Sequence, residues 1–202
     1  MKKKIKIGLV GENPSDTKAI ENLLQDNYPE VAFIHLLKGT ITGNMLDNMM
    51  MLKALRIEVE DHKPHIVLFI RDLDGLKSDI DFAEKYEKRQ NFYSKGKRMV
   101  NFHKEIRTED SLFLLNVYEL EALILADIAT CNAHFGTKIS LDKAAMEYEK
   151  PKEFLQQHGK YQVGEVAVFR KLRLNIVQEN CAYFQDFLQK WNKTLAVHLK
   201  EK

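Results

Sequence analysis

Acidic side chains follow closely after three apolar segments of this sequence. They are Glu12 after residues 5–10, Asp72 and Asp74 after residues 66–70, and Glu119 and Glu121 after residues 111–117. Carboxylates held a few ångströms apart repel one another unless a cation or a proton is shared between them. Oxygen-rich sites of this kind suit Mg²⁺ or Mn²⁺. If the three segments end at one edge of a sheet, the pattern predicts a divalent-cation site there.

The segment from Pro64 to Gly75 decides whether such an edge exists. Its five consecutive apolar residues, 66–70, are too few for a typical helix and predict a strand buried on both faces. Residues two apart in an extended chain point to the same side. We therefore expect the carboxylates of Asp72 and Asp74 to aim one way and Leu73 to turn into the core.

The first part of the chain alternates between strand and helix patterns. Strands are expected over residues 5–10, 31–37, 66–70 and 111–117. Helices are expected after Asn13-Pro14, over residues 45–60 and over residues 122–128. This alternation predicts an α/β fold, with a Rossmann-like parallel sheet of about four strands flanked by helices. Ligands of such sheets bind at the carboxyl ends of the strands. Asp16, one helical turn after Glu12, can face the same point.

Two domains are expected, residues 1–135 as the α/β domain and 136–202 as a helical C-terminal extension packed on it. Apolar residues three or four apart between Glu165 and Leu195 predict one or two amphipathic helices capping the sheet. Residues 141–157 read as helical, with Pro151 as a break. The run Met49-Met50-Met51 is assigned to core packing rather than to a partner surface.

Composition sets only broad limits on this 202-residue chain. The net charge is +2, 45% of the residues are hydrophobic, and the two cysteines match no paired metal spacing. No apolar run approaches the roughly 20 residues of a membrane helix. These features predict a cytoplasmic protein without a membrane partner and exclude no class of soluble function.

A basic helical insertion is expected near residues 77–110. Between residues 82 and 107, eight Lys and Arg stand against three Glu and are interleaved with aromatic rings. This composition suits a nucleic-acid backbone with stacked bases, and it equally suits a solvated helix. The candidate nucleic-acid contacts in this segment are Lys85, Lys88, Arg89, Lys95, Lys97 and Arg98.

The order of these motifs resembles the TOPRIM family, the catalytic module of topoisomerases, primases and OLD-type nucleases. Glu12 after a strand and Asp72-Leu73-Asp74 after another are similar to that family's glutamate and Asp-x-Asp motif. The pair Glu12 and Asp16 is closer to the OLD-like branch. Residues 117–127, Val-Tyr-Glu-Leu-Glu-Ala-Leu-Ile-Leu-Ala-Asp, resemble stand-alone bacterial TOPRIM-like proteins often found near defence genes. The resemblance covers about residues 5–128.

The resemblance implies a role for each acidic residue. Glu12 would be the general acid or base, and Asp72 and Asp74 the main metal ligands. Asp16 and Glu119 would complete a second metal position, with Glu121 in the same ligand set. The candidates for the basic group at the scissile phosphate are Lys160, Arg170 and Arg71. Lys160 and Arg170 are also expected to contact nucleic acid.

These features together predict a divalent-metal-dependent nuclease of DNA or RNA, in phage defence or nucleic-acid processing. The sequence lacks a Gly-x-x-x-x-Gly-Lys-Ser/Thr segment, so an ATPase would be a separate partner. One alternative is a non-catalytic module that binds metal and nucleic acid. Another is a haloacid-dehalogenase-like phosphatase using Asp72 and Asp74, although Leu76 stands where that family has threonine. A homodimer is left open.

Overall fold

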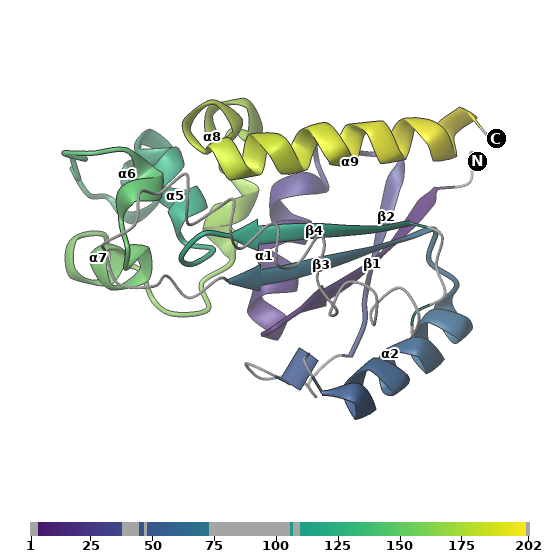
Figure 1. The fold of residues 1–202 in the computed structure, drawn as a ribbon. Coiled ribbons are helices and arrows are strands. Elements are labelled where there is room, and N and C mark those ends of the chain that lie inside the picture. The colour runs from purple at the N-terminus through teal and green to yellow at the C-terminus, as the bar shows by residue number, and fades with distance from the viewer. Residues whose placement is uncertain (1–3, 38–44, 47, 73–105, 107–109, 201–202) are drawn as a thin grey trace.

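The fold is defined by a computed structural model, which describes residues 4–37, 45–46, 48–72, 106 and 110–200. Its sheet contains β1 (Ile5–Gly11), β2 (Val31–His35), β3 (Ile66–Asp72) and β4 (Asp110–Asn116). All neighbouring strands pair in parallel, in the order β2-β1-β3-β4. The expected α/β class and the four-stranded parallel sheet are therefore confirmed (Figure 1).

The central strand β3 is buried as its apolar run predicts. Residues 66–71 are all buried, and only Asp72 at the tip is partly exposed. Side chains alternate between the two faces along the strand. Leu68 and Ile70 belong to one hydrophobic cluster, whereas Val67 and Phe69 belong to another. A strand with apolar groups on both faces requires a helical layer on each side.

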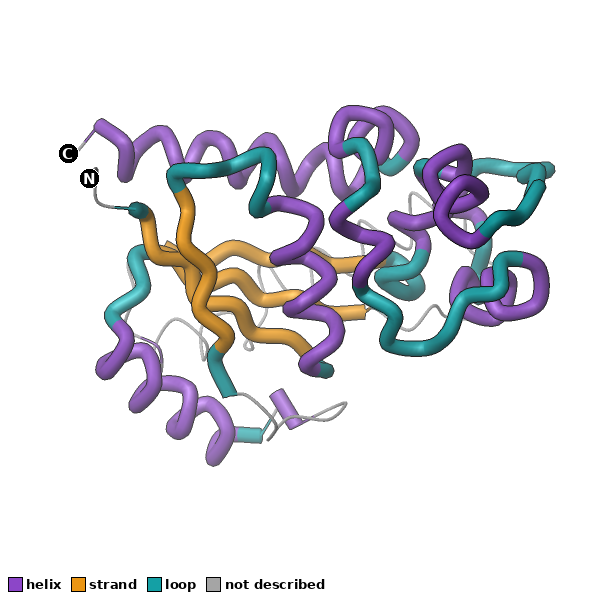
Figure 2. Tube along the Cα trace, turned by 180° about the vertical axis from the view of Figure 1, so that it is seen from behind, coloured by secondary structure: helices purple, strands orange, loops and turns teal. Residues whose placement is uncertain are grey.

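Helices supply both layers. They are α1 (Pro14–Leu24) and α9 (Ala182–Lys200) on one face and α2 (Met49–His62) on the other. The first cluster joins the sheet to Ile20 of α1 and Trp191 of α9, and the second joins it to Leu55 of α2. Figures 1 and 2 show α9 along one side of the sheet and α2 on the opposite side.

The chain reverses its direction across the sheet between β1 and β3. From β1 it passes through α1 to the outer strand β2, and it then returns through α2 to β3 on the other side of β1. Because α1 and α2 cover opposite faces, the carboxyl ends of β1 and β3 lie at a topological switch point. Open α/β sheets bind their ligands at such a point.

The C-terminal part of the chain is helical, as expected. It contains α5 (Ala122–Ala126), α6 (Ile128–Phe135), α7 (Pro151–His158) and α8 (Leu174–Asn180), followed by α9, with 3₁₀ turns at Ala145–Glu147 and Ala167–Arg170. Helices α5, α6 and α7 gather beyond the carboxyl ends of β3 and β4, and α9 runs back along the sheet (Figure 1). This arrangement places C-terminal residues next to the strand tips.

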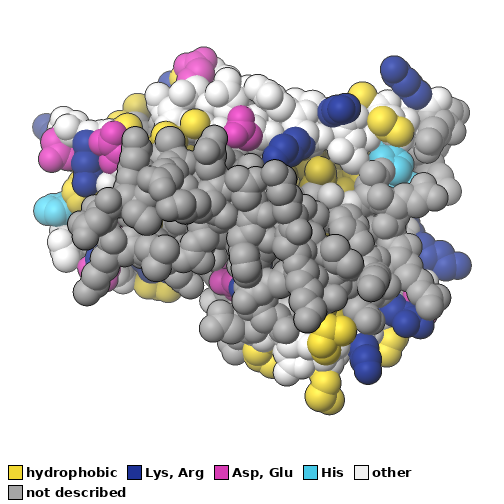
Figure 3. Space-filling view, viewed as in Figure 1, with side chains coloured by type: hydrophobic (Ala, Val, Ile, Leu, Met, Phe, Trp, Pro, Cys, Tyr) yellow, Lys and Arg dark blue, Asp and Glu magenta, His cyan; other side chains and the backbone are white. Residues whose placement is uncertain are grey.

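Two details differ from the sequence-based expectation. Pro151 begins helix α7 rather than breaking a helix, because a proline at the first helical position loses no intrahelical hydrogen bond. The assignment of residues 49–51 to the core is wrong for Met49 and for Met50, which is 75% exposed, whereas Met51 packs against the second cluster. The buried stripe of α2 is Leu52, Leu55 and Val59, and Met50 falls on the opposite face. Figure 3 shows apolar side chains at the surface where α2 lies.

No helix in the described part of the chain is long and apolar enough to cross a membrane.

Candidate functional site

Three carboxyl groups from separate elements converge at the carboxyl end of the sheet. Asp16 lies in the first turn of α1, Asp72 ends β3, and Glu121 directly precedes α5. Burial raises the pKa of Asp16 to about 7, helped by the charges of Glu121 and Glu12. Burial, followed by the charge of Asp16, raises the pKa of Asp72 well above its ordinary range. Groups that perturb one another in this way lie close together in a poorly solvated site.

The first turn of α1 is held against the tip of β1 by local chemistry. Asn13 caps the helix, its Oδ1 accepting a hydrogen bond from the Ser15 amide at 3.1 Å, and Pro14 starts it. A Cβ atom added at Gly11 would lie 3.3 Å from Cβ of Asp16 and 3.0 Å from Cγ2 of Thr17. The glycine therefore permits the close approach that brings Asp16 to the strand end.

Asp72 has a partner on the neighbouring strand. Asn116 lies opposite it in the β3–β4 register, and its Nδ2 donates to Asp72 Oδ1 at 2.9 Å. Asn116 is fully buried. The hydrogen bond lowers the pKa of Asp72, but burial and the neighbouring acids outweigh it. The amide thus fixes the orientation of the Asp72 carboxyl group.

Glu12 reaches the same edge with a cationic partner. Its Oε1 lies 2.6 Å from Nε of Arg71, a residue that is only 3% exposed. Arg71 and Asp72 are consecutive in β3, so their side chains leave opposite faces of the sheet. The negative charge of Glu12 nevertheless raises the pKa of both Asp16 and Asp72. Glu12 and Asp72 therefore belong to one edge of the sheet.

Glu119 anchors the start of α7. Its carboxylate accepts hydrogen bonds from the backbone amide of Lys152 at 3.1 Å and from Lys152 Nζ at 3.2 Å. A carboxylate at a helix N-terminus satisfies a free amide and interacts favourably with the helix dipole. This contact joins the C-terminal helices to the strand ends and occupies both oxygens of Glu119.

Glu121 is more deeply buried than Glu119 and has two partners. The hydroxyl of Tyr161 donates to its Oε1 at 3.0 Å, and Lys152 Nζ lies 3.8 Å from the same atom. Burial raises the pKa of Glu121, while the charge of Lys152 opposes that rise. Asp16, Asp72, Glu121 and Glu12 together form the acidic rim of the sheet. Lys152 is therefore a cation that the C-terminal helices contribute to this acidic rim.

Several candidate residues lie elsewhere or outside the described residues. Asp74 and the basic candidates between residues 85 and 98 are outside them. Arg170 forms an exposed ion pair with Asp26, its Nε 3.0 Å from Oδ2. Asp26 follows the C-terminal end of α1, about 15 Å along the helix axis from Asp16 at 1.5 Å per residue. Lys160 is exposed and precedes Tyr161, the partner of Glu121.

Sequence reasoning missed three residues of this site. Asn116 has a recognisable signal, because it is a polar residue in the apolar run 112–117 and aligns with Asp72 when the strands are paired. Lys152 and Tyr161 have no such signal. They meet Glu119 and Glu121 across 33 and 40 residues of chain, through packing of the C-terminal helices.

The chemistry of the rim suits a hard divalent cation. Among the residues that the structure describes, no three His, Cys, Asp or Glu side chains lie close enough to form a complete metal site. Mg²⁺ is often held by only one or two carboxylates, with water and substrate phosphate as further ligands. Carboxyl groups with raised pKa values and a buried, unpartnered Oδ1 of Asn116 supply hard oxygens and excess negative charge. The residues present therefore fit such an ion.

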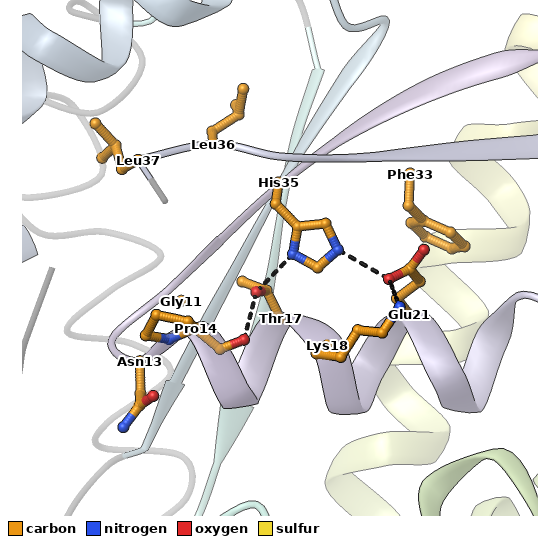
Figure 4. A pocket seen from close by; sticks show the side chains of 10 residues that line it. All are labelled: Gly11, Asn13, Pro14, Thr17, Lys18, Glu21, Phe33, His35, Leu36 and Leu37. Carbon is orange, nitrogen blue, oxygen red and sulfur yellow. Dashed lines mark hydrogen bonds and ion pairs between the residues drawn. The ribbon is translucent and has the colours of Figure 1, made fainter. Parts of the chain in front are cut away.

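A cavity of about 630 Å³ adjoins the rim between α1 and β2 (Figure 4). Gly11 and Asn13, which flank Glu12, form part of its wall. The ring of His35 lies between two polar groups, with Nδ1 2.8 Å from Thr17 Oγ1 and Nε2 2.9 Å from Glu21 Oε2. The cavity is therefore lined by fixed polar side chains and has the size of a small-ligand site.

Comparison with known proteins gives no assignment, because no protein-family model, curated protein or solved structure matches the chain. The resemblance to the TOPRIM family remains a prediction.

Proposed function

We propose that the chain is a divalent-metal-dependent phosphodiesterase that cleaves DNA or RNA. The observation that supports this most directly is the convergence of Asp16, Asp72 and Glu121, from three elements, at the carboxyl end of the sheet. Several carboxyl groups that share one poorly solvated point destabilise the fold unless protons or a cation neutralise them. A group of residues that served only to stabilise the fold would not require several carboxyl groups at one point.

In this proposal Asp72 and Asp16 would hold a Mg²⁺ or Mn²⁺ ion, and Glu12 and Glu121 would add negative charge at the same edge of the sheet. When bound, the ion would lower the pKa of a water molecule and stabilise charge on the reacting phosphate. The side chains have separate tasks. Glu12, oriented by Arg71, accepts a proton from the attacking water. Lys152 binds a non-bridging phosphate oxygen, in place of the candidates Lys160, Arg170 and Arg71.

Glu119 is assigned a structural task. Both of its oxygens already accept hydrogen bonds from Lys152, so it positions that lysine and α7. Its replacement would therefore impair cleavage indirectly, by moving the start of α7.

A cleavage assay tests the proposal. Purified protein is incubated with supercoiled plasmid, single-stranded DNA and RNA, with Mg²⁺, Mn²⁺ or EDTA. We expect metal-dependent nicking or cleavage that Asp72→Asn reduces at least ~10²-fold, as expected for a metal ligand. Asp186→Asn, at an exposed position in α9, is the matched control and should cleave like wild type.

Other results would favour other functions. Salt-sensitive binding of nucleic acid that stays intact with either metal would favour a non-catalytic module. Release of phosphate from small phosphomonoesters, without action on plasmid, would favour the phosphatase alternative.

A further inference from the structure

Asn116 has a buried side-chain oxygen without a partner. The residue is fully buried, its Nδ2 donates to Asp72 Oδ1 at 2.9 Å, and its Oδ1 accepts no hydrogen bond from any residue that the structure describes. Buried amide oxygens are almost always paired, because losing water without gaining a partner costs free energy. An unpaired oxygen beside a cluster of acids therefore suggests a ligand that the described part of the chain does not supply.

The amide orientation follows from the ionised state that Asp72 must have as a metal ligand. Turning the amide over would place Oδ1 against a carboxylate oxygen of Asp72, and an ionised carboxylate only accepts hydrogen bonds. Nδ2 therefore faces Asp72 and Oδ1 does not. Ile70 and Leu114, two residues before Asp72 and Asn116, belong to the cluster that contains the residues of α1. Asp72 and Asn116 thus leave the sheet on the face of α1, which carries Asp16.

We infer that Oδ1 of Asn116 is a direct ligand of the divalent cation, beside Asp72 and on the α1 face of the sheet. This inference rests on the proposed metal-dependent function. A neutral amide oxygen coordinates Mg²⁺ or Mn²⁺ without adding to the repulsion among Asp16, Asp72 and Glu121. Asn116 would thereby supply a neutral ligand where another carboxylate would add repulsion. Oδ2 of Asp72, which does not bind Asn116, would be left for the same ion.

Two replacements separate a ligand from a residue that only orients Asp72. Asn116→Asp keeps an oxygen at this position but removes the donor to Asp72, whereas Asn116→Ala removes both. If Oδ1 binds the ion, Mn²⁺ affinity measured by calorimetry should fall at least ~10-fold in Asn116→Ala and stay within ~3-fold of wild type in Asn116→Asp. Equal losses in both variants would overturn the inference. Asn175→Asp, at an exposed position in α8, is the control.

A second measurement uses the wild-type chain and does not depend on a variant that folds. The side-chain amide resonances of Asn116, assigned by their absence in Asn116→Asp, should move during a Mg²⁺ titration. They should saturate at the dissociation constant found by calorimetry. Resonances that stay in place at saturating Mg²⁺ would overturn the inference, and so would a wild-type chain that binds neither ion at millimolar concentration.

The two proposals fail differently. If the Asn116 resonances move and nucleic acid stays intact, the nuclease proposal fails and the ligand assignment stands. If metal-dependent cleavage occurs and the Asn116 variants bind Mn²⁺ like wild type, the ligand assignment alone fails.

Discussion

Lys152 Nζ lies 3.2 Å from Oε1 of Glu119, and the backbone amide of the same lysine donates to the other oxygen at 3.1 Å. This double contact ties the first turn of α7 to the segment that follows β4. The charges of Glu121, Glu119 and Asp72 raise the pKa of Lys152 against the opposing effect of burial. The C-terminal helices therefore deliver a firmly protonated cation to the acidic rim.

Lys152→Gln tests the role of this cation. Gln is one atom shorter than Lys, but it keeps a polar end and a similar helix propensity and removes the charge. We expect kcat/KM for cleavage to fall at least ~10-fold, since a charged contact to phosphate is worth more than a neutral one. Lys152→Arg should recover part of the rate. Lys150→Gln, which removes an exposed partner of Glu153, should cleave normally. A normal rate in Lys152→Gln would exclude the lysine from substrate binding.

Asp16 makes stability fall as pH rises. Its folded-state pKa is about 7 against an ordinary value of 3.8, so the folded state holds a proton that the unfolded state has lost. Stability is therefore lost as pH rises from about 4 through 7. Asp16→Asn removes this loss, which is at most about 4 kcal/mol at 1.36 kcal/mol per pKa unit.

Thermal unfolding of Asp16→Asn and wild type provides the check. The variant should have the higher Tm at pH 8, and the difference should shrink toward pH 4. Adding Mg²⁺ at pH 8 should raise the Tm of wild type more than that of the variant. A variant less stable than wild type at pH 8 would show that Asp16 is ionised at little cost.

Metal binding should release protons from the rim. Burial raises the pKa of Asp16, Asp72 and Glu121. Neighbouring acids raise the pKa of Asp16 and Asp72 further, and a ligand carboxylate must be ionised. As pH increases toward 7, the apparent affinity for Mn²⁺ should increase about tenfold per pH unit for each proton that the ion displaces. Calorimetry at pH 6.5 in two buffers of different ionisation enthalpy measures the protons released. Equal heats in the two buffers would contradict this expectation.

The arrangement of the sheet could be predicted because the relevant signals are local. The apolar run 66–70 between Pro64 and Gly75 admits one interpretation, and the alternation of strand and helix patterns implies parallel pairing. Parallel strands end at one edge, so the acids after each strand could be expected to meet. Glu12, Asp16 and Asp72 do lie at one edge.

The contacts that define the rim could not be predicted in the same way. The sequence allows Arg71 to be a phosphate-binding residue, but in the structure its side chain pairs with Glu12, which is 59 residues away along the chain. The position of Lys152 depends on how α7 packs. Until that packing is known, Glu119 is equally consistent with a metal ligand and with an anchor for α7. These contacts join residues that are far apart along the chain, and a single sequence does not indicate which distant residues meet.

Lys18 at the cavity beside the rim offers a test of substrate position. Its Nζ lies 2.7 Å from Oε2 of Glu21, and its side chain is 49% exposed. Lys18→Glu reverses the charge where Figure 4 shows the cavity. We expect oligonucleotides to bind ~3–10-fold more weakly at low salt, with Mn²⁺ affinity unchanged. Lys193→Glu, at an exposed position in α9, is the control, and equal losses in both variants would indicate only a general charge effect.

Asp127 and Arg173 hold the C-terminal helices together and predict a separate dependence on acid. The Asp127 side chain is fully buried, and it accepts hydrogen bonds from Arg173 Nη2 at 2.5 Å and from the Arg173 amide at 2.9 Å. Burial alone would raise the pKa of Asp127, but these hydrogen bonds and one from Thr130 lower it to about 2. The stabilisation is therefore complete above about pH 4 and is lost as pH falls through 2.

Asp127→Asn keeps an acceptor oxygen but loses the charge. We expect the variant to be destabilised by on the order of 2 kcal/mol at pH 7, the usual contribution of hydrogen bonds to a charged group. The difference from wild type should shrink below pH 4, where wild type begins to protonate. Urea unfolding at pH 7 and pH 3 measures both quantities, with Asp186→Asn as the exposed control. A loss of equal size at both pH values would assign the effect to side-chain packing instead of charge.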